Sequence, residues 1–352
     1  MKFKPEYYNK VNSLAKYIIT SMEPKMKWMW GEALLGYALD ELDNINNTSL
    51  YTKFLTEYCD YWFKKDPSVD QSDTAAPGLI TYAMYKKTNN ENYKYLTDKV
   101  LKYIRYEPRL IYDCLNHLGC SGKAKIYPKS VWVDSVMMFS VFTSLYAKEN
   151  NDPELIEFAA RQPHQYAKMM FNDKDHLWAH SYWVKTKKPF PRRKIYWGRG
   201  NGWVICAFPM ILDNIGLNHK ESKRIIEIYQ QTSEALLECM NDDYTFNTLL
   251  KHKSYKELSA TALISAGWLH GIRCGYLSKK FLEPALKAFY KCVDCMEEKD
   301  DKILMTNISG PTIPLPLLPK LGYKLTPIGN NWSYGVAALI FAAIEYKKYF
   351  NK

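Results

Sequence analysis

The chain has 352 residues, of which 47% are hydrophobic, and a net charge of +11 from 48 Lys and Arg against 37 Asp and Glu. This length predicts two domains or one large closed architecture, and because no linker or low-complexity tract marks a seam, we expect a single domain over residues 1–352. The sequence has no apolar run of bilayer length and no apolar signal-peptide core, which favours a cytoplasmic protein without a membrane partner.

Helical periodicity runs through the whole sequence. Apolar residues recur at i, i+3, i+4 and i+7, whereas the alternation typical of strands is nearly absent. This pattern predicts helices near 5–20, 29–45, 48–64, 77–88, 92–106, 131–148, 153–170, 202–214, 220–240, 258–276, 280–297 and 333–349.

The predicted helices pair naturally into hairpins. Antiparallel pairs of roughly 55 to 60 residues give about six hairpins, which can close into an all-α (α/α)6 barrel. A superhelical repeat is the structural alternative, but the helices are uneven and the connections at 107–130, 171–199 and 299–332 are long. Long loops rich in Gly, Pro, Trp and His are often functional, and we expect them to gather at one mouth of the barrel.

Two carboxylates stand in unusual surroundings. Asp73 lies in SDTAAPGL before a predicted helix, and Asp134 is the only carboxylate in the apolar stretch VWVDSVMMFSVF. Either residue could be a helix N-cap, and for Asp73 alone capping is the preferred interpretation. If Asp134 instead faces the barrel interior, loss of solvent would raise its pKa, and a pair of acids in one cavity suits glycosidic chemistry.

Aromatic residues cluster around His180 in the segment LWAHSYW. A lone histidine is most often structural, and the other ligands of a metal site are missing, so we expect no metal here. Its position between Trp178 and Trp183 makes contact with a sugar the better functional hypothesis, because aromatic faces bind the C–H faces of sugar rings.

The stretch YWGRGNGWV combines three glycines with two tryptophans and one arginine. Its G-x-G-x-G spacing is one residue short of the dinucleotide fingerprint, and no strand precedes it. The glycines could let the backbone approach a ligand closely, while Trp197 and Trp203 offer flat faces and Arg199 a bidentate fork for a carboxylate. The combination indicates an acidic sugar.

The charge of the chain limits the classes of binding partner, and its cysteines bear on disulfides and zinc. The basic run at 184–194 leads into the glycine-rich stretch and could attract an acidic ligand or be only a solvated surface. Without an identifiable binding module we expect no nucleic-acid partner. The eight cysteines lie in apolar helical contexts, which favours free thiols, and the CxxC at 292–295 lacks a second pair for zinc.

Seven segments together resemble the unsaturated glucuronyl and rhamnogalacturonyl hydrolases of glycoside hydrolase families 88 and 105, the latter more closely. They occur in the family's order between residues 28 and 346: WMWGEALLGYAL, SDTAAPGL, VWVDSVMMFSVF, LWAHSYW, YWGRGNGWV, KELSATALISAGWLHGIRCGYL and WSYGVAALIFAAIEY. The resemblance implies an (α/α)6 barrel that removes a 4,5-unsaturated uronic acid from lyase-generated oligosaccharides, as in pectin degradation. The reaction is hydration of the C4=C5 bond and requires no metal or organic cofactor.

The resemblance also assigns roles to residues. It implies that Asp134 is the general acid and base and that Asp73 is its partner carboxylate. The residues that match substrate-contacting positions or lie in the matching segments are His180, Trp197, Arg199, Trp203, Trp132 and Trp30. The sequence departs from the family at 109–130, where His117 could serve or could be plain loop, and at the basic 184–194 run.

Two other functions remain open. A catalytically silent carbohydrate-binding toroid would keep the cavity without the chemistry. An (α/α)6 sugar epimerase or isomerase would need two histidines as acid and base, and only His180 is well placed in the sequence. We expect an acidic unsaturated di- or oligosaccharide of the rhamnogalacturonan type as the partner, and a monomer or homodimer.

Overall fold

The computed structural model describes residues 2–22, 26–192 and 194–351. The α-helices are α1 (Pro5–Ser21), α2 (Trp30–Asn46), α3 (Thr52–Lys65), α4 (Ser72–Ala75), α5 (Gly78–Thr88), α6 (Glu91–Tyr106), α7 (Val141–Glu149), α8 (Pro153–Met170), α9 (Gly198–Ile215), α10 (Ser222–Leu237), α11 (Leu258–Cys274), α12 (Leu282–Asp294), α13 (Pro319–Leu325) and α14 (Ser333–Phe350). Two 3₁₀-helices, η1 (Gly122–Lys125) and η3 (Lys279–Phe281), and a π-helix, η2 (Val136–Ser140), complete the helical part.

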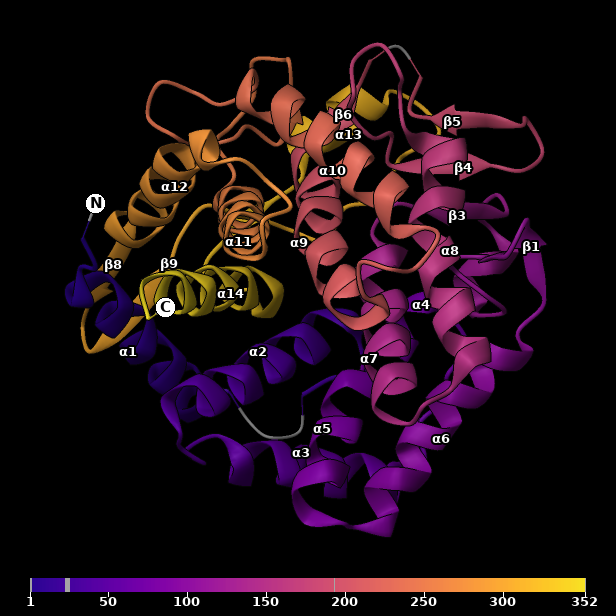
Figure 1. Cartoon of the computed structure of the whole chain (residues 1–352), viewed down its shortest axis with the longest axis horizontal. Helices are drawn as coiled ribbons and strands as arrows, with labels where there is room; N and C mark the ends of the chain where they lie inside the picture. The colour runs from indigo at the N-terminus through magenta and orange to yellow at the C-terminus, as the bar shows by residue number, and fades with distance from the viewer. Residues whose placement is uncertain (1, 23–25, 193, 352) are drawn as a thin grey trace.

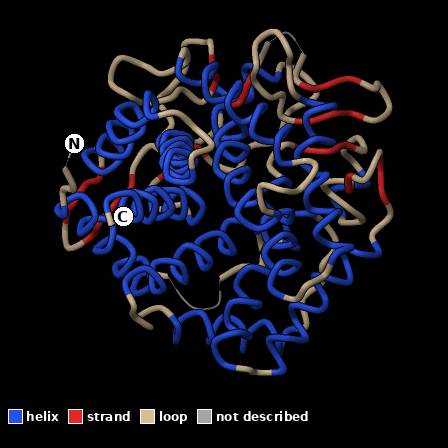
Figure 2. Tube along the Cα trace, viewed as in Figure 1, coloured by secondary structure: helices blue, strands red, loops and turns tan. Residues whose placement is uncertain are grey.

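Short strands occupy the connections between helices (Figure 2). They are β1 (Arg109–Ile111), β2 (Cys114–Leu115), β3 (Ser130–Trp132), β4 (Ser181–Trp183), β5 (Lys188–Phe190), β6 (Tyr196–Trp197), β7 (Leu249–Leu250), β8 (Met296–Lys299), β9 (Lys302–Met305), β10 (Ile308–Ser309) and β11 (Ile328–Gly329). All are antiparallel, in the pairs β1-β2, β6-β7, β8-β9 and β10-β11 and in the three-stranded sheet β3-β4-β5.

The long helices form two concentric rings (Figure 1). Each inner helix contacts the next in the order α2, α5, α7, α9, α11 and α14, and α14 returns to α2. The outer helices α1, α3, α6, α8, α10 and α12 alternate with them along the chain. Near the closure, the backbone N–H of Lys4 donates to the hydroxyl of Tyr346 (2.6 Å). This is the arrangement of an (α/α)6 barrel, as the hairpin pattern predicts.

The two rings differ in how their helices bury side chains. In α11 every residue from Leu258 to Ile272 is buried, as a helix enclosed on all sides requires. The outer α6 buries one face and exposes the charged residues of the other. Close packing of the inner ring needs small residues: a Cβ added to Gly267 would lie 2.2 Å from the carbonyl oxygen of Ile205, so only glycine lets α11 approach α9 this closely.

The structure corrects two predicted helix starts. The helix expected over 131–148 begins instead as strand β3 and a turn, continues as η2, and becomes α-helical only at Val141. The β-branched and aromatic side chains from Val131 to Val133 suit a strand, and β3 pairs with β4. The helix expected over 202–214 begins earlier, at Gly198, so the glycine-rich stretch forms the first turns of α9 and is not a loop. No described helix is long and apolar enough to cross a membrane.

Candidate active site

A cavity of about 780 Å³ opens at one mouth of the barrel. All three long connections contribute to its wall, as expected: the first through Tyr127, the second through Trp197 and the third through Thr312. The predicted site residues that line it are Trp30, Asp73, Trp132, Asp134, Trp197 and Arg199. His180 and Trp203 do not line it but lie behind its wall, where both side chains are inaccessible to solvent.

Asp73 does not occupy the N-cap position of its helix. Gln71 stands at that position of α4, and its backbone N–H donates to the hydroxyl of Thr74 (3.2 Å). Capping, the preferred interpretation of Asp73 in isolation, is therefore not its role. Its carboxylate lies 3.6 Å from Nε2 of His117, and the residue is 8% exposed.

Asp134 lies in the turn between β3 and the π-helix. Its backbone is fixed on both sides: the N–H of Val133 donates to the carbonyl of His180 (2.8 Å), and the N–H of Met137 donates to the carbonyl of Asp134 (2.9 Å). The side chain is 9% exposed, and its buried Oδ1 has no hydrogen-bond partner among the described residues. The fixed backbone thus holds the carboxyl group in place, and its unpartnered Oδ1 is available to a ligand. Short π-helical turns of this kind are frequent at functional sites.

Both carboxyl groups have strongly raised pKa values. Burial raises the pKa of Asp134 to about 7, against smaller lowering effects of its own backbone N–H and of the Arg199 charge. Burial, and next the charge on Asp134, raise the pKa of Asp73 to about 8, while Lys123 lowers it. Because the two groups interact, they titrate as a pair, and near neutral pH the pair holds between one and two protons.

His117 completes the polar wall beside Asp73. Its ring stacks on Trp132 with centroids 4.1 Å apart and planes 7° from parallel, and its Nδ1 lies 2.7 Å from the Ser135 hydroxyl. Burial, with the nearby charge of Lys123, lowers its pKa to about 3, so the ring is neutral at physiological pH. The sequence left open whether His117 contributes to the site or is only a loop residue. In the structure its side chain lines the cavity.

His180 and Trp203 support the wall from behind. The His180 ring stacks on Trp197 (centroids 4.2 Å apart), and its Nδ1 lies 2.7 Å from the hydroxyl of Tyr323. Burial lowers the pKa of His180 well below its ordinary value. Trp203 meets Trp30 edge to face at 6.1 Å. In this structure both residues orient tryptophans that line the cavity; their contact with substrate stays a prediction.

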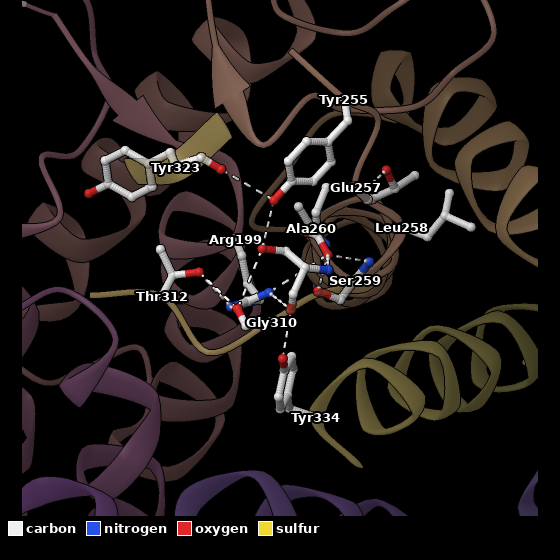
Figure 3. A network of polar contacts seen from close by, with 12 residues as sticks. Arg199, Tyr255, Glu257, Leu258, Ser259, Ala260, Gly310, Thr312, Tyr323 and Tyr334 are labelled. Atoms are coloured by element: carbon white, nitrogen blue, oxygen red, sulfur yellow. Dashed lines mark hydrogen bonds and ion pairs between the residues drawn. The ribbon is translucent and has the colours of Figure 1, made fainter. Parts of the chain in front are cut away.

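Arg199 is a fully buried strut, and Figure 3 shows its surroundings. Its guanidinium donates to the carbonyls of Ser309 (2.7 Å) and Gly310 (2.8 Å). Nη1 also lies 3.7 Å from the carboxylate of Glu257, which is equally inaccessible to solvent. In this structure the fork that the sequence assigned to a ligand carboxylate therefore donates to the main chain at the end of β10. Arg199 borders the cavity with a side chain that is inaccessible to solvent, and its contact with a substrate stays a prediction.

The glycines around Arg199 serve packing within the protein. A Cβ at Gly198 would lie 2.5 Å from the carbonyl oxygen of Asn247, and one at Gly200 would lie 2.7 Å from the Trp197 ring. The close approach predicted for these glycines is real, but its partners are protein groups. They let the first turn of α9 pack closely against Trp197 and against the segment that leads into β7.

Other lining residues were not found from the sequence. Glu32, at the start of α2, and Trp332 and Tyr334, at the start of α14, all line the cavity. Burial raises the pKa of Glu32. The signal available for Glu32 was the one used for Asp134, a lone carboxylate at the start of an apolar helix. Tyr334 stacks on Trp30 at 4.5 Å.

One set of possible metal ligands occurs outside the cavity among the described residues. Asp213, His270 and Cys274 place a ligand atom each within 4.8 Å of one another. The carboxylate of Asp213 is already hydrogen-bonded to His270 (2.7 Å) and to the Tyr276 hydroxyl (2.9 Å), which accounts for the cluster as a structural network.

The geometry defines a class: an (α/α)6 barrel whose mouth holds an aromatic-walled cavity with two buried, partly protonated carboxyl groups. The chain belongs to Glycosyl Hydrolase Family 88, whose model matches residues 6–350. The resemblance inferred from the sequence is thereby confirmed.

Comparison with individual proteins agrees with this assignment. The chain is 28% identical over 169 residues to the unsaturated 3S-rhamnoglycuronyl hydrolase of Alteromonas sp. (strain LOR), a match that covers 46% of this chain and 41% of that protein's length. It is 22% identical over 340 residues to the unsaturated rhamnogalacturonyl hydrolase of Bacillus subtilis, covering 95% of both. A solved family 105 glycoside hydrolase from C. acetobutylicum superposes with a TM-score of 0.86 at 22% identity, covering 96% of this chain and 99% of that one. The barrel fold is thus confirmed.

Proposed function

We propose that this chain removes a 4,5-unsaturated uronic acid from the non-reducing end of lyase-generated oligosaccharides by hydrating the C4=C5 bond. The observation that carries the proposal is the pair of buried carboxyl groups, Asp73 and Asp134, whose pKa values rise to about 8 and about 7 in one cavity. The names of the two relatives, both unsaturated-uronyl hydrolases, support the substrate class.

The reaction follows from a single proton donor. The protonated carboxyl of Asp134 gives its proton to C4, and positive charge develops at C5 and the ring oxygen. The resulting carboxylate takes a proton from water as that water bonds to C5, which restores the acid. The hemiketal then opens to a ketone at C5, and the hemiacetal left at C1 releases the rest of the oligosaccharide. The tryptophans of the wall exclude solvent from the charged intermediate.

Asp73 has a distinct role in this scheme. With the higher pKa, it keeps its proton longer than Asp134 and can donate a hydrogen bond to a ring hydroxyl. Asp73 also lies beside His117. Because the His117 ring is neutral, it contributes no positive charge that would stabilise the ionised form of Asp134.

An epimerase is disfavoured on the same grounds. The structure does bring a second histidine, His117, to the site, but burial keeps both His117 and His180 neutral near pH 7. A histidine whose pKa lies far below its ordinary value cannot serve as a proton donor at neutral pH.

A panel of unsaturated disaccharides from different polysaccharide lyases tests the proposal directly. We expect unsaturated disaccharides from a rhamnogalacturonan lyase to lose the ultraviolet absorbance of their double bond, faster than those from ulvan or glycosaminoglycan lyases. Saturated disaccharides of the same composition serve as the control. A chain that binds these sugars but consumes none of the double bonds would be a carbohydrate-binding toroid.

The pH profile gives a second prediction. Because the pKa of Asp134 is raised, its acid form is present below about pH 7 and is lost above it. We therefore expect kcat/KM to fall about tenfold for each pH unit above roughly 7 to 8, where an ordinary carboxyl would already be fully ionised. Steady-state kinetics from about pH 5 to 9 measure this. A profile that is flat between about pH 7 and 9 would contradict the assignment.

Location and assembly are also proposed. All eight cysteines are free thiols, and four of them are exposed or half-buried, which suits a reducing compartment such as the cytoplasm. We take the working form to be a monomer or homodimer, which light scattering would distinguish.

A further inference from the structure

A second hollow of about 830 Å³ lies beside the hairpin β4-β5. Figure 1 shows this hairpin at the upper right. One wall comes from the hairpin and the residues after it, through Trp183, Phe190 and Arg192. The other comes from α13 and the residue before it, through Leu318, Lys320, Leu321 and Lys324. Among the described residues, none lines both this groove and the cavity that holds the two carboxyl groups.

The hairpin wall carries a braced pair of aromatic rings. Trp183 stacks on Phe190 with centroids 4.1 Å apart and planes at 22°. Tyr127 meets Trp183 edge to face at 6.0 Å, and its hydroxyl donates to the carbonyl of Pro314 (2.7 Å). Tyr127 also meets Trp132 at 5.4 Å. The aromatic wall is therefore rigid, and one side chain joins it to the wall of the carboxylate cavity.

The groove is basic and its charges are unpaired. Arg192, Lys320 and Lys324 line it and are exposed, and no carboxylate lines it in the described part of the chain. Among residues 2–22, 26–192 and 194–351, these three side chains form no ion pair, and neither do the exposed lysines of the hairpin, Lys185, Lys187 and Lys188. Nearby Lys194, by contrast, pairs with Asp175. Several unpaired cations around one concave surface attract an anion.

We propose that this groove is a second binding site, which takes an acidic oligosaccharide. Rigid aromatic faces and the exposed Leu318 (72%) and Leu321 (48%) suit the apolar faces of sugar rings, while the cations suit carboxylate or sulfate groups. A second copy of the chain is the disfavoured occupant, because it would bring the same cations and its own charge of +11 to the same place. The proposal concerns binding alone and stands whether or not the cavity hydrates a double bond.

The test uses saturated acidic oligosaccharides, which have no double bond to be consumed. Oligogalacturonate and a chondroitin sulfate hexasaccharide are titrated calorimetrically into the full chain, with maltohexaose as the neutral comparison. The charge-reversal variant Lys320→Glu/Lys324→Glu should weaken binding of one or both acidic sugars by about tenfold or more. Both lysines are exposed, so the fold should survive, which circular dichroism checks.

A matched variant controls for net charge. Lys10→Glu/Lys16→Glu reverses two exposed lysines on α1, away from the groove, and should change binding less than about twofold, since screening limits distant charges. Binding of only the carboxylated or only the sulfated sugar identifies the preferred anion and still supports the site. Equal losses in both variants, undiminished binding in the groove variant, or equal affinity for maltohexaose would overturn it. So would a concentration-dependent dimer that the groove variant abolishes.

Discussion

Replacing Asp134 by Asn is expected to lower kcat for an unsaturated disaccharide by about 10³- to 10⁴-fold. The same carboxyl group both protonates C4 and activates water, so one substitution removes two steps, and general acid and base catalysis by one group is worth about 10²- to 10⁴-fold. The amide has nearly the same shape, and the buried Oδ1 of Asp134 has no protein partner to lose. The measurement is the decay of the double-bond absorbance under saturating substrate.

Binding separates catalysis from structure in this variant. Because the cavity wall is unchanged, Asp134→Asn should bind the disaccharide within a few-fold of the parent affinity, measured by calorimetry. Asp173→Asn, at an exposed aspartate, is the matched control and should leave both quantities unchanged. Loss of binding and activity together in a folded Asp134→Asn protein would mean that the aspartate is structural.

The helical frame was predictable because it rests on local pattern. Apolar periodicity located α8 (Pro153–Met170) and most other long helices to within a few residues, since each buries a face that repeats every three to four positions. Strands of two to four residues are too short to alternate visibly, so β3 and the π-helix after it were predicted as one helix.

The site was predictable only where chemistry broke the local pattern. Asp134 stood out as a carboxylate among apolar residues, and Asp73 became a candidate only beside it. That Gln71 and not Asp73 stands at the N-cap position of α4 could not be predicted, because Asp is the more usual cap. The partners of Arg199 lie about 110 residues away in the sequence, and nothing local points to Ser309 or Gly310.

Replacing Arg199 by Met is expected to lower the free energy of unfolding by about 3–5 kcal/mol. The substitution removes the donors to Ser309 and Gly310 and leaves the Glu257 carboxylate buried without its countercharge, and breaking a buried ion pair on one side has about this cost. The measurement is urea unfolding at neutral pH. The variant Arg199→Lys should retain only part of the free energy of unfolding that Arg199→Met loses, because an ammonium group lacks the fixed fork that donates to both carbonyls.

A second substitution tests why the loss occurs. In the Arg199→Met background, Glu257→Gln should restore part of the lost stability, because a neutral amide needs no countercharge and can still accept from the backbone N–H of Ser309. The two changes should thus be non-additive by more than about 1 kcal/mol. If Arg199→Met instead unfolds like the parent but loses affinity for the unsaturated sugar, the fork belongs to the ligand, and the main-chain contacts seen here give way when substrate enters. One measurement of stability and one of binding therefore distinguish a structural role of Arg199 from a role in binding the carboxylate of the substrate.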